Sequence, residues 1–136
     1  MKINFTEINQ SRTFVHHRSE TSIKVTKVKS GALITLIDED HSATVLIENN
    51  DELEQLKLLI ENSKINSSKK NQSVSDENII FSVQQSTFGE PFEECFEFEL
   101  IIANPNKQWG YVSMSSYLDS HSLNLFIECI EQFLTE

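Results

Sequence analysis

Two groups of histidine and carboxylate residues have the chemistry to bind a metal ion. His16 and His17 are adjacent, and residues 38–41 read Asp-Glu-Asp-His. Adjacent residues of a strand point to opposite faces, so the two imidazoles do not readily share one ion. The second group lacks the alternating oxygen ligands, central glycine and closing glutamate of a calcium loop. We therefore expect no metal site and no cofactor, and we interpret residues 38–41 as a polar hairpin turn.

A second group combines serine, aspartate and histidine near the C-terminal end. Ser115 and Ser116 precede Asp119 and His121, which are the residue types of a nucleophile, an orienting acid and a base. Asp119 and Ser120 are better placed as candidate caps of a following helix, whose first turn would hold His121. The chain has only three glycines, so it offers neither a glycine-flanked nucleophile elbow nor a phosphate-binding loop. The sequence therefore favours a protein that is not an enzyme.

Length and composition indicate one globular domain spanning residues 1–136. Apolar residues make up 38% and charged residues 24% of the chain. The apolar runs are far shorter than the roughly 20 residues that span a membrane, and the N-terminus lacks a signal-peptide stretch, so we expect a cytoplasmic protein. Cys95 and Cys129 are not spaced as a redox pair or a zinc site, and we expect reduced, partly buried thiols.

The net charge of −10 is distributed unevenly along the chain. Residues 1–31 carry six basic and two acidic groups (+4), whereas residues 32–63 carry one basic and eight acidic groups (−7). Residues 64–78 sum to +1, and residues 79–136 to −8, with one basic and nine acidic groups. This excess of acidic groups favours a basic protein as partner and disfavours nucleic acid.

The order of predicted elements repeats once, which predicts an antiparallel α+β fold. Each half, 22–63 and 79–136, reads as three strands followed by an amphipathic helix. The polar segment 62–78 would be a flexible linker, because it has little to bury. Residues 2–8 and 13–17 have the patterns of two additional N-terminal strands. A sheet face or edge left uncovered would also allow two copies to form a homodimer.

The helix of the first half should follow a strand at 43–47 and end near Asn62. The segment Asn49-Asn50-Asp51 offers an N-cap, and Glu54 has capping-box spacing from Asp51. The helix of the second half, 120–134, has a complete apolar stripe that should be buried against a sheet. This stripe consists of Leu123, Phe126, Ile127, Ile130, Phe133 and Leu134.

The clearest strand of the sequence begins near Phe92 and separates its residues into two faces. The apolar face would hold Phe92, Phe96, Phe98, Leu100 and Ile102. A further strand should run from Trp109 to Ser115.

Glu93, Glu97 and Glu99 share the opposite face of the strand that begins near Phe92, and within residues 79–136 only Lys107 is basic. We expect these three glutamates to stay exposed and to bind a basic partner, with a simple solvated face as the alternative.

Two halves of strands plus a helix resemble the organisation of Whirly-type single-strand-binding proteins, whose halves each hold a sheet and a helix. The resemblance covers residues 22–136 and concerns topology rather than any sequence motif. It implies a nucleic-acid-binding module, in which only Lys24, Lys27 and Lys29 would contact phosphates. A strand-binding face combines basic with aromatic residues, whereas the aromatic residues of 92–98 are interleaved with glutamates.

These observations favour a non-enzymatic acidic module that binds a basic protein by occlusion and electrostatic steering. In size, charge and class the chain is similar to toxin-immunity proteins, which act as inhibitors, and to small acidic secretion chaperones. That likeness concerns composition and assigns no residue. The alternative function is nucleic-acid binding by the basic N-terminal third.

Overall fold

The computed structural model describes residues 11–65, 73–76, 79–103 and 111–135. It confirms an α+β fold with two antiparallel four-stranded sheets and two helices. The elements in chain order are β1 (Ser11–His16), β2 (Thr21–Val28), β3 (Gly31–Asp38), β4 (His41–Ile47), α1 (Asn50–Ile65), β5 (Ser73–Asp76), β6 (Ile79–Phe88), β7 (Glu93–Ala103), β8 (Tyr111–Leu118) and α2 (Ser120–Thr135).

Strands β1 to β4 form the first sheet as consecutive antiparallel hairpins. Every second residue along each strand points to the inner face of this sheet. Phe14, Ile23 and Leu36 are paired with one another across three strands, share this face and are buried. Gly31 begins β3 because a Cβ at this position would collide with the backbone carbonyl oxygen of Ile47. The absence of a side chain at Gly31 therefore allows β3 and β4 to approach closely at this end.

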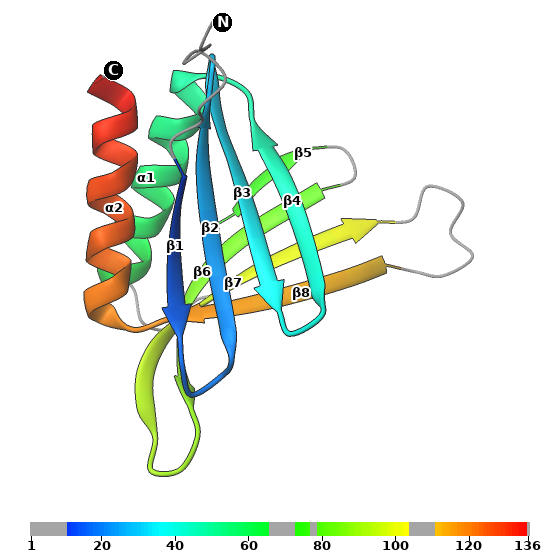
Figure 1. Ribbon diagram of the computed structural model, residues 1–136, viewed down its shortest axis with the longest axis vertical. Coiled ribbons are helices and arrows are strands. Elements are labelled where there is room, and N and C mark those ends of the chain that lie inside the picture. Colours follow the sequence, from blue (N-terminus) through cyan, green and yellow to red (C-terminus); the bar gives the residue numbers. More distant parts are fainter. Residues whose placement is uncertain (1–10, 66–72, 77–78, 104–110, 136) are drawn as a thin grey trace, which may run out of the picture.

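Strands β5 to β8 form the second sheet in the same consecutive order. Its apolar face carries Phe81, Val83, Phe98 and Leu100, all buried. The β6–β7 hairpin runs beyond the last β7–β8 pair, which joins Phe96 to Leu118. The end of this hairpin therefore projects from the body of the sheet (Figure 1).

The two helices lie side by side at one side of both sheets (Figure 1). Asp119 caps α2, since its Oδ1 accepts a hydrogen bond from the Ser122 N–H at 2.7 Å. The predicted stripe of α2 is confirmed: Leu123, Phe126, Ile127, Ile130 and Phe133 are buried, and Leu134 is partly buried against the same core.

One hydrophobic core joins the two halves. Strand β8 crosses β1, β2 and β3, so the two sheets overlap at a steep angle (Figure 1). The ring of Phe126 lies 5.4 Å from that of Phe14 in the first sheet and 5.6 Å from that of Phe98 in the second, measured between centroids. These aromatic contacts connect α2 to both halves.

Each predicted half, 22–63 and 79–136, contains the predicted three strands and one helix, and each sheet has a fourth strand from outside these ranges. Strand β1 corresponds to the expected strand at 13–17, whereas β5 lies inside the segment 62–78 that we expected to be a linker without regular structure. Helix α1 also extends into that segment, to Ile65. Residues 66–72 and 77–78 of the predicted linker lie outside the described residues, as do the candidate strand 2–8 and Trp109.

The cap of helix α1 lies within the predicted segment Asn49-Asn50-Asp51, but its partner differs from the prediction. Asn49 Oδ1 accepts the Glu52 N–H at 2.9 Å, while Glu52 Oε2, rather than Glu54, reaches back and accepts the Glu48 N–H at 2.7 Å. Phe92 does not join the buried apolar face of β7. Phe92 is 77% exposed, because it precedes β7 at the end of the projecting hairpin, where no second layer covers it.

Candidate functional site

The three glutamates predicted to bind a partner do share one face of β7, and all three are half-buried. Glu93 is held by two residues of the first half. Its Oε1 lies 3.1 Å from His16 Nε2, and its Oε2 lies 3.3 Å from Arg18 Nη1. Arg18 also donates to the carbonyl oxygen of Pro91 at 2.8 Å, which fixes the turn that contains Arg18 against the β6–β7 hairpin.

Glu97 and Glu99 are also partly buried by neighbouring residues. Glu97 Oε1 accepts a hydrogen bond from Gln84 Nε2 at 2.6 Å, and its Oε2 accepts one from the Tyr117 hydroxyl at 3.3 Å. Oxygen Oε1 of Glu99 is inaccessible to solvent. The expectation of three exposed carboxylates without a covering basic residue is therefore wrong, because the β1–β2 turn and neighbouring strands supply partners from distant parts of the chain.

His16 joins a serine and a carboxylate, which the sequence did not lead us to expect. Its ring is 3% exposed, and Ser19 Oγ lies 2.7 Å from Nδ1. The Ser19 N–H also donates to Nδ1 at 3.2 Å, so Nε2 carries the hydrogen that points to Glu93. Ser19 Oγ lies 2.7 Å from Thr21 Oγ1, which accepts the Tyr117 N–H at 2.9 Å.

This network contains the residue types of a catalytic triad, but its hydrogen bonds connect the first sheet to the second. Ser19 belongs to the β1–β2 turn, and its hydroxyl is engaged by both His16 and Thr21. The network ends on the backbone of β8, where Tyr117 is held. It thus links the first sheet to the second sheet beside Glu93, and we assign it the role of positioning the two sheets.

Two side chains beside the β7 glutamates resist ionisation. Burial raises the pKa of the Cys95 thiol to about 11, and the charges of Glu93 and Glu97 add to this effect. Burial likewise raises the pKa of Tyr117 to about 12, with the charge of Glu97 and its hydrogen bond as further causes. Cys95 is therefore a protonated, unreactive thiol at neutral pH.

The structure does not bring the three lysines of the alternative site onto one surface. Lys24 is exposed on the outer face of the first sheet. Lys27 points to the opposite face, where its Nζ lies 5.7 Å from the centroid of the Phe133 ring in α2. Lys29 is exposed in the β2–β3 turn. Lys24 and Lys27 are three residues apart on β2, so they point to opposite faces, and Lys29 lies beyond the end of that strand.

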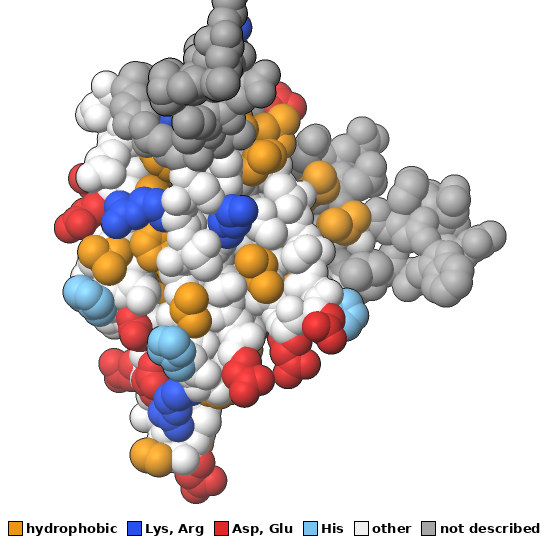
Figure 2. Space-filling view, viewed as in Figure 1, with side chains coloured by type: hydrophobic (Ala, Val, Ile, Leu, Met, Phe, Trp, Pro, Cys, Tyr) orange, Lys and Arg blue, Asp and Glu red, His pale blue; other side chains and the backbone are white. Residues whose placement is uncertain are grey.

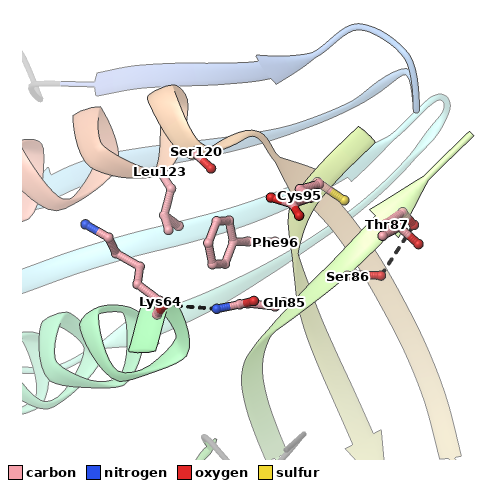
Figure 3. Close-up of a pocket in the computed structure, with 9 residues that line it drawn as sticks. Lys64, Gln85, Ser86, Thr87, Cys95, Phe96, Ser120 and Leu123 are labelled. Atoms are coloured by element: carbon pink, nitrogen blue, oxygen red, sulfur yellow. Dashed lines mark hydrogen bonds between the residues drawn. The ribbon is translucent and has the colours of Figure 1, made fainter. Parts of the chain in front are cut away.

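A polar pocket of about 540 Å³ lies between the end of α1, the start of α2 and strands β6 and β7 (Figure 3). Phe96 and Leu123 face it, and Gln85 Nε2 donates to the carbonyl oxygens of Ser63 and Lys64 at 3.0 Å each. The Lys64 ammonium donates to Asn124 Oδ1 at 2.7 Å. Among its described lining residues, the pocket has one basic residue, whose ammonium is hydrogen-bonded to Asn124, and the acidic Glu94, so its charges favour neither an anionic nor a cationic ligand.

A second cavity is a groove of about 420 Å³ between the β3–β4 hairpin and strands β7 and β8. Below, the term groove refers to this cavity. The residues that line it are Asp38, His41, Ser42, Ala43, Leu100, Ile102, Ser113, Met114 and Ser115. Among these described lining residues there is no lysine or arginine, and Leu100, Ile102 and Met114 give it an apolar floor.

The groove adjoins the hairpin turn at residues 38–41, which is strongly acidic. Asp38, Glu39 and Asp40 connect β3 to β4, and all three are exposed. Figure 2 shows acidic side chains gathered along the lower edge of this view, where Figure 1 places the β3–β4 turn. The run of acidic residues was visible in the sequence, but its position beside an apolar groove depends on the second sheet.

Comparisons with known proteins leave the family open. No protein-family model matches the chain, and no curated protein has significant similarity to it. Neither helix of the described chain is long and apolar enough to cross a membrane. Within the described ranges, three or more histidine, cysteine or carboxylate side chains do not gather in an arrangement that could hold a metal ion.

Proposed function

We propose that this protein is a non-enzymatic acidic module that binds a basic protein partner. The observation that carries the proposal is the exposed β3–β4 turn, where Asp38, Glu39 and Asp40 lie beside the apolar groove. Acidic groups at the border of an apolar surface steer a cationic partner and then allow it to bury apolar side chains. Binding would occlude the partner's own surface, as an inhibitor, an immunity protein or a chaperone does.

The contacts of several cations support this proposal. Arg18 pairs with Glu93, and Lys57 Nζ lies 3.9 Å from Glu61 and 3.6 Å from Glu131. These basic side chains neutralise acidic groups elsewhere, on the β7 face and on the helices. The acidic turn keeps its negative potential for a partner, in a chain whose net charge is −10.

The test is capture of partners from a lysate of the native host, with and without nuclease treatment. We expect a basic protein to be enriched in both samples. Neutralising the turn with Asp38→Asn, Glu39→Gln and Asp40→Asn should slow association with the purified partner and flatten its salt dependence. Recovery of partners only in the sample without nuclease would contradict the proposal.

A matched control distinguishes an effect of the position of the removed charges from an effect of the change in net charge. Glu54→Gln, Glu94→Gln and Glu128→Gln also remove three charges, from exposed positions outside the turn. This control should leave the association rate within about twofold of wild type. Equal slowing by both triple variants would show that only net charge matters.

Nucleic-acid binding is the second candidate, and one observation favours it. The outer face of the first sheet carries Lys24 among hydroxyl and aliphatic side chains, and its described strand residues include no carboxylate on that face. Gel-shift titrations at low salt test it, and we expect no binding below micromolar concentrations. Tight binding that Lys24→Glu removes and Lys27→Glu leaves intact would establish this second function instead.

A further inference from the structure

Among the described strands, the groove lies along a strand edge to which no further strand is paired. Strand β8 is the last strand of the second sheet and pairs with β7 on one side. The Tyr117 N–H points away from β7, because it donates to Thr21 Oγ1. Alternate residues of an antiparallel strand direct their backbone groups to the same side, so those of Ser113 and Ser115 also point away from β7. Both serines line the groove.

The floor of the groove suits apolar side chains that alternate along an extended segment. Met114 is half-buried, Leu100 is buried, and Ile102 is 42% exposed. These residues share the face of the second sheet that β1 to β3 cover elsewhere. Ala43 of β4 forms the opposite wall. A strand added to β8 would direct every second side chain onto this apolar floor.

The charges around the groove select for basic residues in the segment that binds. Asp38 lines the groove, and Glu39 and Asp40 extend the acidic turn beside it. A second copy of this chain is a poor occupant, since its own β8 edge lies beside the same acidic turn and like charges would meet. The complementary occupant is an extended segment that carries lysine or arginine together with apolar residues.

We infer that the partner docks by adding one extended segment to the β8 edge at Ser113–Ser115. Its side chains on the covered face of the sheet lie beside Met114 and below the acidic turn, so this face of the segment carries both apolar and basic residues. This inference rests on the proposed function, because it takes the partner to be a basic protein. It adds the mode of recognition, in which main-chain hydrogen bonds supply affinity and the groove supplies specificity.

A synthetic peptide tests the mode without knowledge of the partner. The probe is a fluorescent seven-residue peptide that alternates lysine and valine, titrated with the full chain and followed by anisotropy. Two further versions carry N-methyl groups, either on all valine amides or on all lysine amides. Each version blocks one edge of the extended peptide. We expect one version to lose at least tenfold in affinity and the other to keep it.

Protein variants then locate the site. Ala43→Arg places a bulky cation in the groove and should weaken probe binding at least tenfold. The matched control is Thr44→Arg, which adds the same group on the opposite face of β4 and should change affinity less than twofold. If thermal unfolding shows that Ala43→Arg does not fold, the exposed substitution Asp38→Lys replaces it, with the same expected loss.

The outcomes distinguish this inference from the proposed function. Equal binding of both N-methylated peptides, or equal affinity of the Ala43→Arg and Thr44→Arg variants, overturns strand addition at β8. Absence of probe binding to the wild-type chain overturns it as well. In each of these cases a nuclease-resistant basic partner in the capture experiment would still support the proposed function, through another surface.

Discussion

The β7 glutamate row and the acidic turn each contain three carboxylates, but their surroundings differ. Glu93 and Glu97 of the row are half-buried and bound to side chains of other elements. The three carboxylates of the turn between β3 and β4 are exposed. Carboxylates that already accept internal hydrogen bonds cannot be offered to a partner without breaking these bonds. Availability for binding thus depends on the tertiary neighbours of an acidic group, and not on the number of acidic groups in a segment.

The largest expected effect on stability comes from weakening the core that the two sheets share. Phe126→Ala removes the ring that contacts Phe14 and Phe98, and should lower the free energy of unfolding by about 3–5 kcal/mol. Urea denaturation measures this loss, with the exposed substitution Asn124→Ala as control. A single cooperative transition is expected for the wild type, and two separate transitions would contradict a shared core.

Removing the first glutamate of the β7 row should have an intermediate effect. Glu93→Ala leaves the Nε2–H of His16, a side chain only 2% exposed, without its acceptor, and should cost about 1–3 kcal/mol. The lost pair with Arg18 adds little, because that guanidinium is largely solvated. The neighbouring exposed substitution Glu94→Ala should cost less than about 0.5 kcal/mol. Equal costs in urea denaturation would show that Glu93 behaves as a surface residue.

Alkaline pH should weaken the region around the glutamate row. The pKa of Cys95 is raised from 9.0 to about 11, so the unfolded state loses this proton first. Stability should therefore be retained below pH 9 and fall as pH rises toward 11. Cys95→Ala should flatten this fall in the urea midpoint under reducing conditions. The same slope in the variant and the wild type would contradict burial of the thiol in this environment.

The smallest effect on folding is expected at the acidic turn. The triple substitution Asp38→Asn, Glu39→Gln and Asp40→Asn should change the free energy of unfolding by less than about 0.5 kcal/mol. Changing Glu93, Glu97 and Glu99 together to glutamine should destabilise the chain more, contrary to what an exposed face would tolerate. Thermal and urea unfolding of both triple variants, measured side by side, compare the two regions. The reverse order would contradict the difference in burial described above.

Local patterns in the sequence predicted much of the fold. The apolar stripe of α2, its cap at Asp119 and the two faces of β7 all depend on neighbours within a few residues. The strand at 13–17 is predicted from its adjacent apolar residues Phe14 and Val15, and β1 confirms it. Strand β5 was missed because the polar segment around it has few apolar residues, and its place in the sheet comes from pairing with β6.

The sequence by itself determined the two-half α+β organisation, the acidic character of the chain and the faces of its strands. Only the tertiary structure decided which faces are covered. The β1–β2 turn brings His16 and Arg18 to Glu93, 77 and 75 residues away, and the second sheet forms a groove beside Asp38. Alternation along a strand assigns each residue to a face, but contacts between distant segments decide whether that face meets solvent or protein.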